Sequence, residues 1–221
     1  MVVPTYNDFK SLSTFLNLIE EQKSSRINYL IVNNGSTDSG IEELLNASSK
    51  YWKCKKLKSN LGFGGGILEG IKAAETDWVG WMPGNLKIKP ADVEKLVASL
   101  TFKRETFTKC HRLRKSKSAK IKTFVAGFIQ SVLTKSNLFD TGGTPTICER
   151  SFILRLTNLP TDFVFESRIL FEARNSNLLI ERPWIPYGER VYGSSHWQKG
   201  LRSELALMRK IWVSARTWKN V

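Results

Sequence analysis

Short apolar runs alternate with amphipathic segments along the first hundred residues, and this alternation limits the fold more than any other feature of the sequence. Apolar runs predict strands at residues 1–4, 29–33, 54–58 and 78–82. Segments with helical spacing predict helices at residues 11–22, 38–47, 65–74 and 91–100. Because strands and helices alternate, we expect an α/β fold with a mostly parallel, Rossmann-like sheet flanked by helices. Ligands of such sheets bind beyond the carboxyl ends of the strands.

The second half of the chain has a weaker pattern. Residues 103–122 contain nine Lys or Arg and one Glu, and they run into an amphipathic helix expected at 119–135. A polar turn at 140–145, a strand near Thr146, a helix at 163–174 and a strand at 178–185 follow. From residue 199 onward, apolar side chains recur at helical spacing among basic ones. We therefore expect one domain over residues 1–197 and a basic amphipathic helix over residues 198–221.

Composition limits the partners and the compartment. The chain has 34 basic and 20 acidic residues, a net charge of +14, which favours partners that carry phosphate. No nucleic-acid-binding module is present, so we expect no nucleic acid partner. The run at 124–133 is too short to span a membrane. Three scattered cysteines and two histidines fit neither a disulfide framework nor a zinc site, which favours the cytoplasm.

Three of the expected strands end in loops rich in Gly, Asn and Ser. Two of these loops, at 33–38 and 60–66, lead directly into an expected helix. Backbone N–H groups at a helix N-terminus suit a phosphorylated ligand, but the same residues are also ordinary turn formers and helix caps. The glycines at 62–66 do not follow the dinucleotide-binding pattern, because the third glycine is displaced and the next strand ends in Met82 and Pro83.

Five segments in this order resemble family-2 glycosyltransferases of the GT-A fold. They are VPTYND at 3–8, VNNGSTD at 32–38, NLG at 60–62 with Gly70 beyond it, WMPGN at 81–85 and RVYGSSH at 190–196. The last segment is similar to the R-x-x-G-x-S-K segment of the dolichyl-phosphate mannose synthase branch. The resemblance covers residues 1 to about 197.

The resemblance implies a nucleoside diphosphate sugar as donor and an inverting displacement at its anomeric carbon. The implied acceptor is a polyprenyl phosphate or a cell-surface saccharide. The implied donor-binding residues are Pro4, Tyr6, Asn7, Asn34, Gly35, Asn60, Gly62, Gly84 and Asn85.

The acidic D-x-D motif, which binds a metal in this family, is replaced here by Pro83, Gly84 and Asn85. An Asn85 amide is a weak ligand for Mg²⁺ or Mn²⁺, which prefer charged oxygens. Three outcomes are open: a weakly held metal, protein cations in its place, or impaired catalysis. The last would make the chain a degenerate homologue that binds a ligand or partner without turnover.

Candidates for the phosphate and acceptor contacts lie in the second half of the chain. The resemblance implies Arg190, Ser195 and His196 on a late loop, and Arg112 and Arg114 come from the basic stretch. Arginine binds phosphate oxygens in pairs and can replace part of a metal's charge. The alternative for the basic stretch is a solvated loop.

Each acidic residue near the expected acceptor region has a functional and a structural interpretation. Asp140 is either a catalytic carboxylate or a turn residue. Asp162 and Glu166 fall near an acidic position of the family's acceptor region, or they are charges at a helix N-terminus. A phosphate acceptor needs little general base, because it is already ionised near neutral pH.

The C-terminal helix also has two interpretations. Its basic and Trp-bearing composition suits an anionic membrane surface, which would make the protein peripheral on the cytoplasmic face. Its apolar stripe, Leu201, Leu205, Met208, Trp212 and Ala215, would equally suit packing against the domain.

Overall fold

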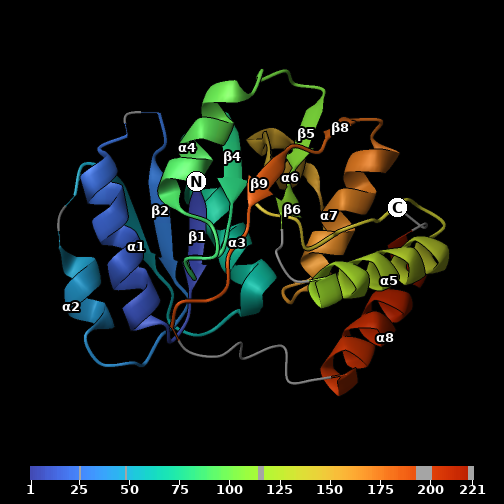
Figure 1. Cartoon of the computed structure of the whole chain (residues 1–221), viewed down its shortest axis with the longest axis horizontal. Helices are drawn as coiled ribbons and strands as arrows, with labels where there is room; N and C mark the ends of the chain where they lie inside the picture. Colours follow the sequence, from blue (N-terminus) through green and yellow to red (C-terminus); the bar gives the residue numbers. More distant parts are fainter. Residues whose placement is uncertain (25, 48, 114–116, 193–200, 219–221) are drawn as a thin grey trace.

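The computed structural model describes residues 1–24, 26–47, 49–113, 117–192 and 201–218. In this part of the chain, strands form a mixed seven-stranded sheet in the order β3-β2-β1-β4-β7-β5-β8 and a small sheet of β6 and β9 (Figure 1). The strands are β1 (Val2–Thr5), β2 (Tyr29–Asn33), β3 (Trp52–Lys56), β4 (Trp78–Trp81), β5 (Thr106–Lys109), β6 (His111–Leu113), β7 (Thr146–Glu149), β8 (Leu179–Glu181) and β9 (Trp184–Pro186). The helices are α1 (Phe9–Gln22), α2 (Ile41–Asn46), α3 (Gly62–Ala73), α4 (Pro90–Ser99), α5 (Lys117–Thr134), α6 (Arg150–Arg155), α7 (Val164–Asn175) and α8 (Leu201–Trp218).

The large sheet is parallel except at β7. Strand β7 runs antiparallel to both of its neighbours, β4 and β5, while the remaining pairs are parallel. The loop that precedes β7 therefore lies at the same edge as the carboxyl ends of the other strands. This α/β architecture confirms the expected fold class.

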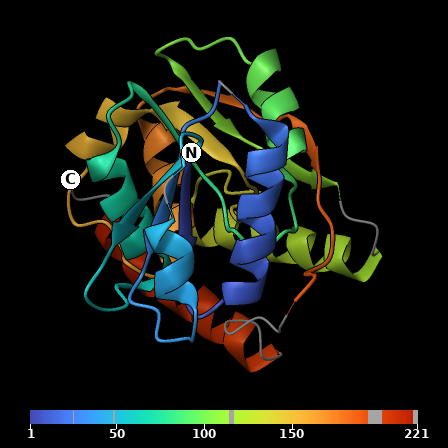
Figure 2. The same ribbon diagram turned by 90° about the vertical axis from the view of Figure 1, so that its left-hand side faces the viewer.

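Each face of the sheet has its own apolar core, and successive residues of β1 show the division. Val2 packs in a core with α3, α6, α7 and α8, whereas Val3 packs in the opposite core with α1, α2 and α4. Figure 2 shows the sheet between these two layers of helices. Burial on both faces explains why β1, β2 and β4 are nearly continuous apolar runs in the sequence.

Helix α3 lies unusually close to the sheet. A Cβ atom at Gly70 would lie 2.3 Å from Val2 Cγ1 and 2.9 Å from Val32 Cγ2, so only glycine fits this contact. The glycine that the sequence places after the third loop therefore serves helix-to-strand packing.

One expectation about the second half of the chain was wrong, and one alternative for the basic stretch is not supported. Residues 178–185 do not form one strand, because Arg182 and Pro183 separate β8, which pairs with β5, from β9, which pairs with β6. The basic stretch is not simply a loop: Thr106 and Phe107 belong to the buried strand β5, and β6 follows directly. Thr and Phe favour strands, a signal that the surrounding positive charge obscured.

Smaller differences concern boundaries. Strand β3 ends two residues earlier than expected, and α6 was not expected at all. Of the two interpretations of the C-terminal helix, the structure agrees with packing against the domain, because Ile211, Ala215 and Trp218 of α8 belong to the core beneath α7. Within the described residues, no helix is long and apolar enough to cross a membrane.

Candidate functional site

The candidate site lies along the carboxyl edge of the large sheet. The loops after β1, β2 and β4, the junctions β5–β6 and β8–β9, and the turn before β7 meet there. Two backbone bonds join these segments, because Cys110 N–H donates to the Pro145 carbonyl (3.1 Å) and His111 N–H donates to the Pro183 carbonyl (2.8 Å). Segments far apart in sequence thus present their side chains at one edge.

Asn7 ties the loop after β1 to the loop after β2. Its Oδ1 accepts from the Thr37 N–H (2.8 Å), and its own N–H donates to Ser36 Oγ (3.1 Å). The backbone of Asn7 has φ 48°, a left-handed conformation that asparagine tolerates better than most residues. Asn7 therefore fixes the loop after β1 against the loop after β2.

Asn34 is buried, and both polar atoms of its side chain are engaged within the protein. Nδ2 donates to the Gly62 carbonyl (2.9 Å) and to Asn60 Oδ1 (3.2 Å), and Oδ1 accepts from the Leu61 N–H (2.9 Å). The structure thus brings together three residues that the resemblance implies as donor ligands: Asn34, Asn60 and Gly62. Their hydrogen bonds join the loop after β2 to the loop before α3.

The glycine-rich start of α3 is covered by the chain itself. A Cβ atom at Gly62, where φ is 80°, would lie 2.5 Å from the Thr161 carbonyl oxygen. Gly65 N–H donates to that same oxygen (2.9 Å), and Gly62 N–H donates to Asn60 Oδ1 (2.8 Å). The expectation that this helix N-terminus receives a phosphate is therefore not supported, because two of its amides, Gly62 and Gly65, are engaged and the segment at 160–165 packs over it.

The remaining donor candidates differ in access. Tyr6 is 39% exposed at the end of β1, so its ring is available to a ligand. Pro4 is part of β1, and Gly35 (φ 72°) packs against Ser59. Gly84 packs against the side chain of Val3, and its neighbour Asn85 accepts the Lys87 N–H at 3.3 Å through Oδ1.

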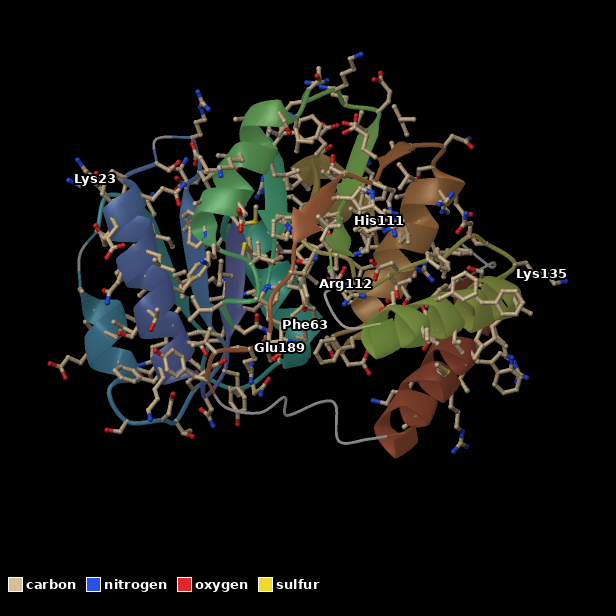
Figure 3. All side chains as sticks on the ribbon, viewed as in Figure 1. Lys23, Phe63, His111, Arg112, Lys135 and Glu189 are labelled. Atoms are coloured by element: carbon tan, nitrogen blue, oxygen red, sulfur yellow. The ribbon has the colours of Figure 1, made fainter. Side chains whose placement is uncertain are left out.

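A charged cluster surrounds Asp140 in the turn before β7. Arg112 of β6 forms an ion pair with Asp140, and His111 Nδ1 lies 3.5 Å from the other carboxylate oxygen. Arg182 donates to the carbonyl of Phe139 (2.6 Å) and faces His111 at 3.4 Å. Figure 3 shows His111 and Arg112 between α5 and the sheet. These groups come from three segments up to 71 residues apart.

The cluster carries one net positive charge near neutral pH. Burial opposes ionisation of Asp140, but the charge and hydrogen bond of Arg112, together with the charges of Arg182 and Lys109, outweigh burial and hold the pKa of Asp140 below its usual value of 3.8. Burial, with the charge of Arg182, lowers the pKa of His111 below 6.5, so the imidazole is neutral at pH 7. Asp140 is therefore a weak base that holds Arg112 in position.

Arg190 has a carboxylate partner, Asp8, which sequence reasoning did not single out. Arg190 Nη2 lies 3.0 Å from Asp8 Oδ2, and both side chains are about one fifth exposed. The segment that leads to Arg190 is held by two backbone hydrogen bonds. The Tyr187 N–H donates to the Leu113 carbonyl (3.3 Å), and the Gly188 N–H donates to the Lys87 carbonyl (2.8 Å). The segment from Arg182 to Arg190 thus runs across the carboxyl edge from β8 to β1.

A buried ion pair behind this edge was also missed. Lys109 Nζ lies 2.6 Å from Glu166 Oε2 and donates to Thr146 Oγ1 (3.0 Å), and the Trp81 indole N–H donates to Glu166 Oε1 (2.9 Å). Glu166 is thus a buried partner of a lysine, and Asp162 accepts from the Val164 N–H at the start of α7. Burial lowers the pKa of Lys109 despite the nearby carboxylate.

The residues at the D-x-D position do not fit a divalent metal. Asn85 offers one neutral oxygen, and Pro83 and Gly84 offer no side-chain ligand. No group of three or more His, Cys, Asp or Glu able to hold a metal occurs among the described side chains. Arg114, Ser195 and His196 lie outside the described residues.

The comparisons with known proteins identify the family. Residues 1–157 match glycosyl transferase family 2. Since the match covers most of the chain, the protein belongs to this family, and it is a glycosyltransferase that uses a nucleotide sugar.

Solved structures of similar shape confirm the GT-A fold. Glucosyl-3-phosphoglycerate synthase from Mycobacterium tuberculosis, in complex with Mn²⁺, UDP and glucosyl-3-phosphoglycerate, is 14% identical with a TM-score of 0.72 over 98% of this chain and 77% of that chain. A UDP complex of that synthase gives 15% identity and a TM-score of 0.71 over 100% and 79%. A further mycobacterial protein gives 15% identity and a TM-score of 0.72 over 98% and 72%.

Proposed function

We propose that this glycosyltransferase moves a sugar from a nucleoside diphosphate sugar to an acceptor that carries a phosphate, with a polyprenyl phosphate as the preferred acceptor. The observation that carries the acceptor assignment is the cluster of Arg112, Arg182, His111 and Asp140 at the carboxyl edge. A saccharide acceptor would need a general base for its hydroxyl group. Asp140 is poorly suited to that task, because neighbouring positive charges lower its pKa and so make it a weak base.

The arginines of this cluster retain capacity to bind an anion. Arg112 Nε and Arg182 Nη1 are buried and have no hydrogen-bond partner among the described residues. Paired guanidinium groups suit the several oxygens of a phosphate. The synthase of similar fold has been solved with UDP-glucose and phosphoglyceric acid together, so an acceptor with a phosphate is compatible with this fold.

On the donor side, the proposed contacts are Tyr6 for the base and the loops after β1 and β2, which Asn7 joins, for the ribose and diphosphate. The departing nucleoside diphosphate gains negative charge, which the protein must stabilise. Because Asn85 cannot replace a carboxylate ligand, we assign this task to Arg190, which its ion pair with Asp8 holds beside the end of β1. The similar synthase binds Mn²⁺ or Mg²⁺, so metal dependence is an explicit part of the test.

The experiment measures transfer from radiolabelled sugar nucleotides to a short polyprenyl phosphate. Arg112→Ala and Arg182→Ala should each raise the KM for the acceptor by about tenfold or more while leaving nucleotide binding intact. Arg155→Ala, an exposed arginine on α6, is the matched control and should behave like the parent. Stabilisation by UDP or GDP in a thermal-shift assay reports donor binding separately, because a bound ligand raises the melting temperature.

A second candidate function follows from the replaced D-x-D motif. A degenerate homologue would bind a nucleotide without turning it over. Nucleotide-induced stabilisation with no transfer to phosphate or saccharide acceptors, with or without Mg²⁺ or Mn²⁺, would favour this alternative. Transfer to a saccharide but not to a phosphate would refute the acceptor assignment.

A further inference from the structure

Helix α5 exposes large apolar side chains and buries polar ones, the opposite of an ordinary surface helix. Its outward side carries five large apolar side chains, each between 47% and 64% exposed. They recur at helical spacing and form one stripe: Ile121, Phe124, Val125, Phe128 and Val132. A surface helix normally turns such a stripe toward the core.

The inward side of α5 is polar instead. Gln130 is 6% exposed, and its Oε1 accepts from Thr141 Oγ1 (3.0 Å) and Ser167 Oγ (3.1 Å). Ser131 Oγ accepts from the Leu138 N–H (2.9 Å), and Thr134 is buried. These hydrogen bonds hold the polar side of α5 against the domain, so the apolar stripe faces outward.

Charge indicates what covers the stripe. Residues 111–139, which include all of α5, contain seven Lys or Arg and no Asp or Glu. A second copy of this chain docked there by two-fold symmetry would bring two such basic segments together, in a chain whose net charge is already +14. An apolar stripe within a wholly basic segment is instead complementary to an anionic lipid surface.

We propose that the outward face of α5 docks the enzyme on an anionic lipid bilayer, with Phe124, Phe128 and Val132 in the interface. This inference builds on the proposed function, because it supplies the route by which a lipid-linked phosphate reaches the site. It assigns to α5 the membrane contact that the sequence suggested for α8, whose Ile211, Ala215 and Trp218 are buried in the core.

The same helix is attached to the proposed acceptor cluster. Gln130 holds Thr141, the neighbour of Asp140, and the Phe124 ring meets the Phe139 ring edge-on with centroids 5.3 Å apart. In Figure 3, Arg112 lies near one end of α5 and Lys135 near the other. A bilayer against the stripe would therefore lie next to the cluster that we assign to the acceptor phosphate.

The test is flotation with vesicles of phosphatidylcholine alone and of phosphatidylcholine with phosphatidylglycerol. The parent should float with the anionic vesicles and much less with the neutral ones, and added salt should weaken its binding. Phe128→Gln together with Val132→Gln removes two exposed apolar side chains and keeps good helix formers. This double variant should lose roughly tenfold or more in partition to anionic vesicles.

Leu179→Gln on β8 is the matched control, because Leu179 is 61% exposed but lies on a different element. It should bind vesicles like the parent. All variants should keep the parent melting temperature and its response to UDP, which separates docking from folding and donor binding.

The outcomes are distinct. Equal binding to neutral and anionic vesicles, or no binding to either, would overturn the proposal. Dimerisation of the parent that the double variant abolishes would overturn it in favour of a second copy on this face. Binding to anionic vesicles that the double variant loses would support it, and would do so even if no sugar were transferred, an outcome that refutes only the proposed function.

Discussion

Lys109 and Glu166 form an ion pair inside the protein, where their side chains are 1% and 9% exposed. Removing one member leaves the other charge buried without its counterion. Lys109→Met should therefore lower the free energy of unfolding by about 3–5 kcal/mol, measured by urea denaturation at pH 7.

The control for this prediction is a double variant. Adding Glu166→Gln to Lys109→Met removes the uncompensated charge and keeps an acceptor for the Trp81 indole N–H, so it should restore part of the loss. Lys53→Met breaks an exposed pair with Glu75 and should change stability by less than about 1 kcal/mol. If Lys109→Met and Lys53→Met lowered the free energy of unfolding by similar amounts, burial of the Lys109–Glu166 pair would not explain the loss.

Asp140 should make stability depend on acid pH. Its folded-state pKa lies below the ordinary 3.8 because Arg112, with the charges of Arg182 and Lys109, outweighs the effect of burial. A carboxyl group whose pKa is lowered by folding contributes stability above its unfolded pKa and loses it as the pH falls through its folded pKa. Asp140→Asn should cost about 3 kcal/mol at pH 7, and the gap should close as the pH falls below about 4. Denaturation curves at several pH values measure both; a gap that does not change with pH would refute the assignment.

Arg190 and Asn85 should respond oppositely to metal. If Arg190 stabilises the departing diphosphate, Arg190→Ala should lower turnover by about 10²–10³, and Asn85→Ala should lower it less. Asn85→Asp restores a charged ligand and should increase stimulation by Mg²⁺ or Mn²⁺. Activity with EDTA and with each metal is the measurement. A parent that works only with metal, together with an active Arg190→Ala variant, would contradict this division of roles.

At the scale of elements, most of the first half of the chain could be predicted from sequence because β1, β2 and β4 are largely buried, whereas the edge strand β3 is mostly exposed. The apolar runs at β1, β2 and β4 mark the strands directly, and Pro90 marks the first residue of α4. The second half was less predictable, because β6, β8 and β9 are only three residues long and β5 lies within a stretch of basic residues. Strand β5 forms because its residues are buried in the sheet, and the charges around it in the sequence do not reveal that burial.

Gly70 provides a test of how closely α3 packs on the sheet. Gly70→Ala gains about 1 kcal/mol in helix propensity, but its Cβ would lie 2.3 Å from Val2 Cγ1. Overpacking of this kind costs about 1–3 kcal/mol, and the contact is so short that we expect a net loss of stability. Gly188→Ala is the control, because its Cβ would meet only the Lys87 carbonyl oxygen at 3.7 Å. Thermal denaturation compares the two, and a more stable Gly70→Ala variant would refute the close contact.

At the scale of the whole molecule, the location of the candidate site could be predicted but its charged cluster could not. Parallel strands place their carboxyl ends at one edge, which was enough to bring the loops after β1 and β2 together. The cluster around Asp140 depends on the antiparallel strand β7 and on the break between β8 and β9 at Arg182. Local sequence does not show which strands pair, so the partners of Arg112 were not foreseen and Arg182 was missed. Asp8 was missed because its partner Arg190 is 182 residues away.

The C-terminal helix α8 tests how far the folded unit extends. The Trp218 ring is 3% exposed, lies 5.2 Å from the Phe171 ring and has Arg168 over it at 5.6 Å. Trp212, on the same helix, is 39% exposed. Trp218→Ala should cost about 3–5 kcal/mol through the cavity it leaves, whereas Trp212→Ala should cost much less, because much of its ring is already in water.

Because the two substitutions remove the same side chain from one helix, their difference isolates burial from helix propensity. Urea denaturation measures the free energy of unfolding, and both variants should unfold in a single transition with similar m-values. If Trp218→Ala were as harmless as Trp212→Ala, α8 would be an appendage beyond residue 197. A large and selective loss for Trp218→Ala would make α8 an integral layer of the glycosyltransferase domain and leave α5 as the helix with the exposed apolar face.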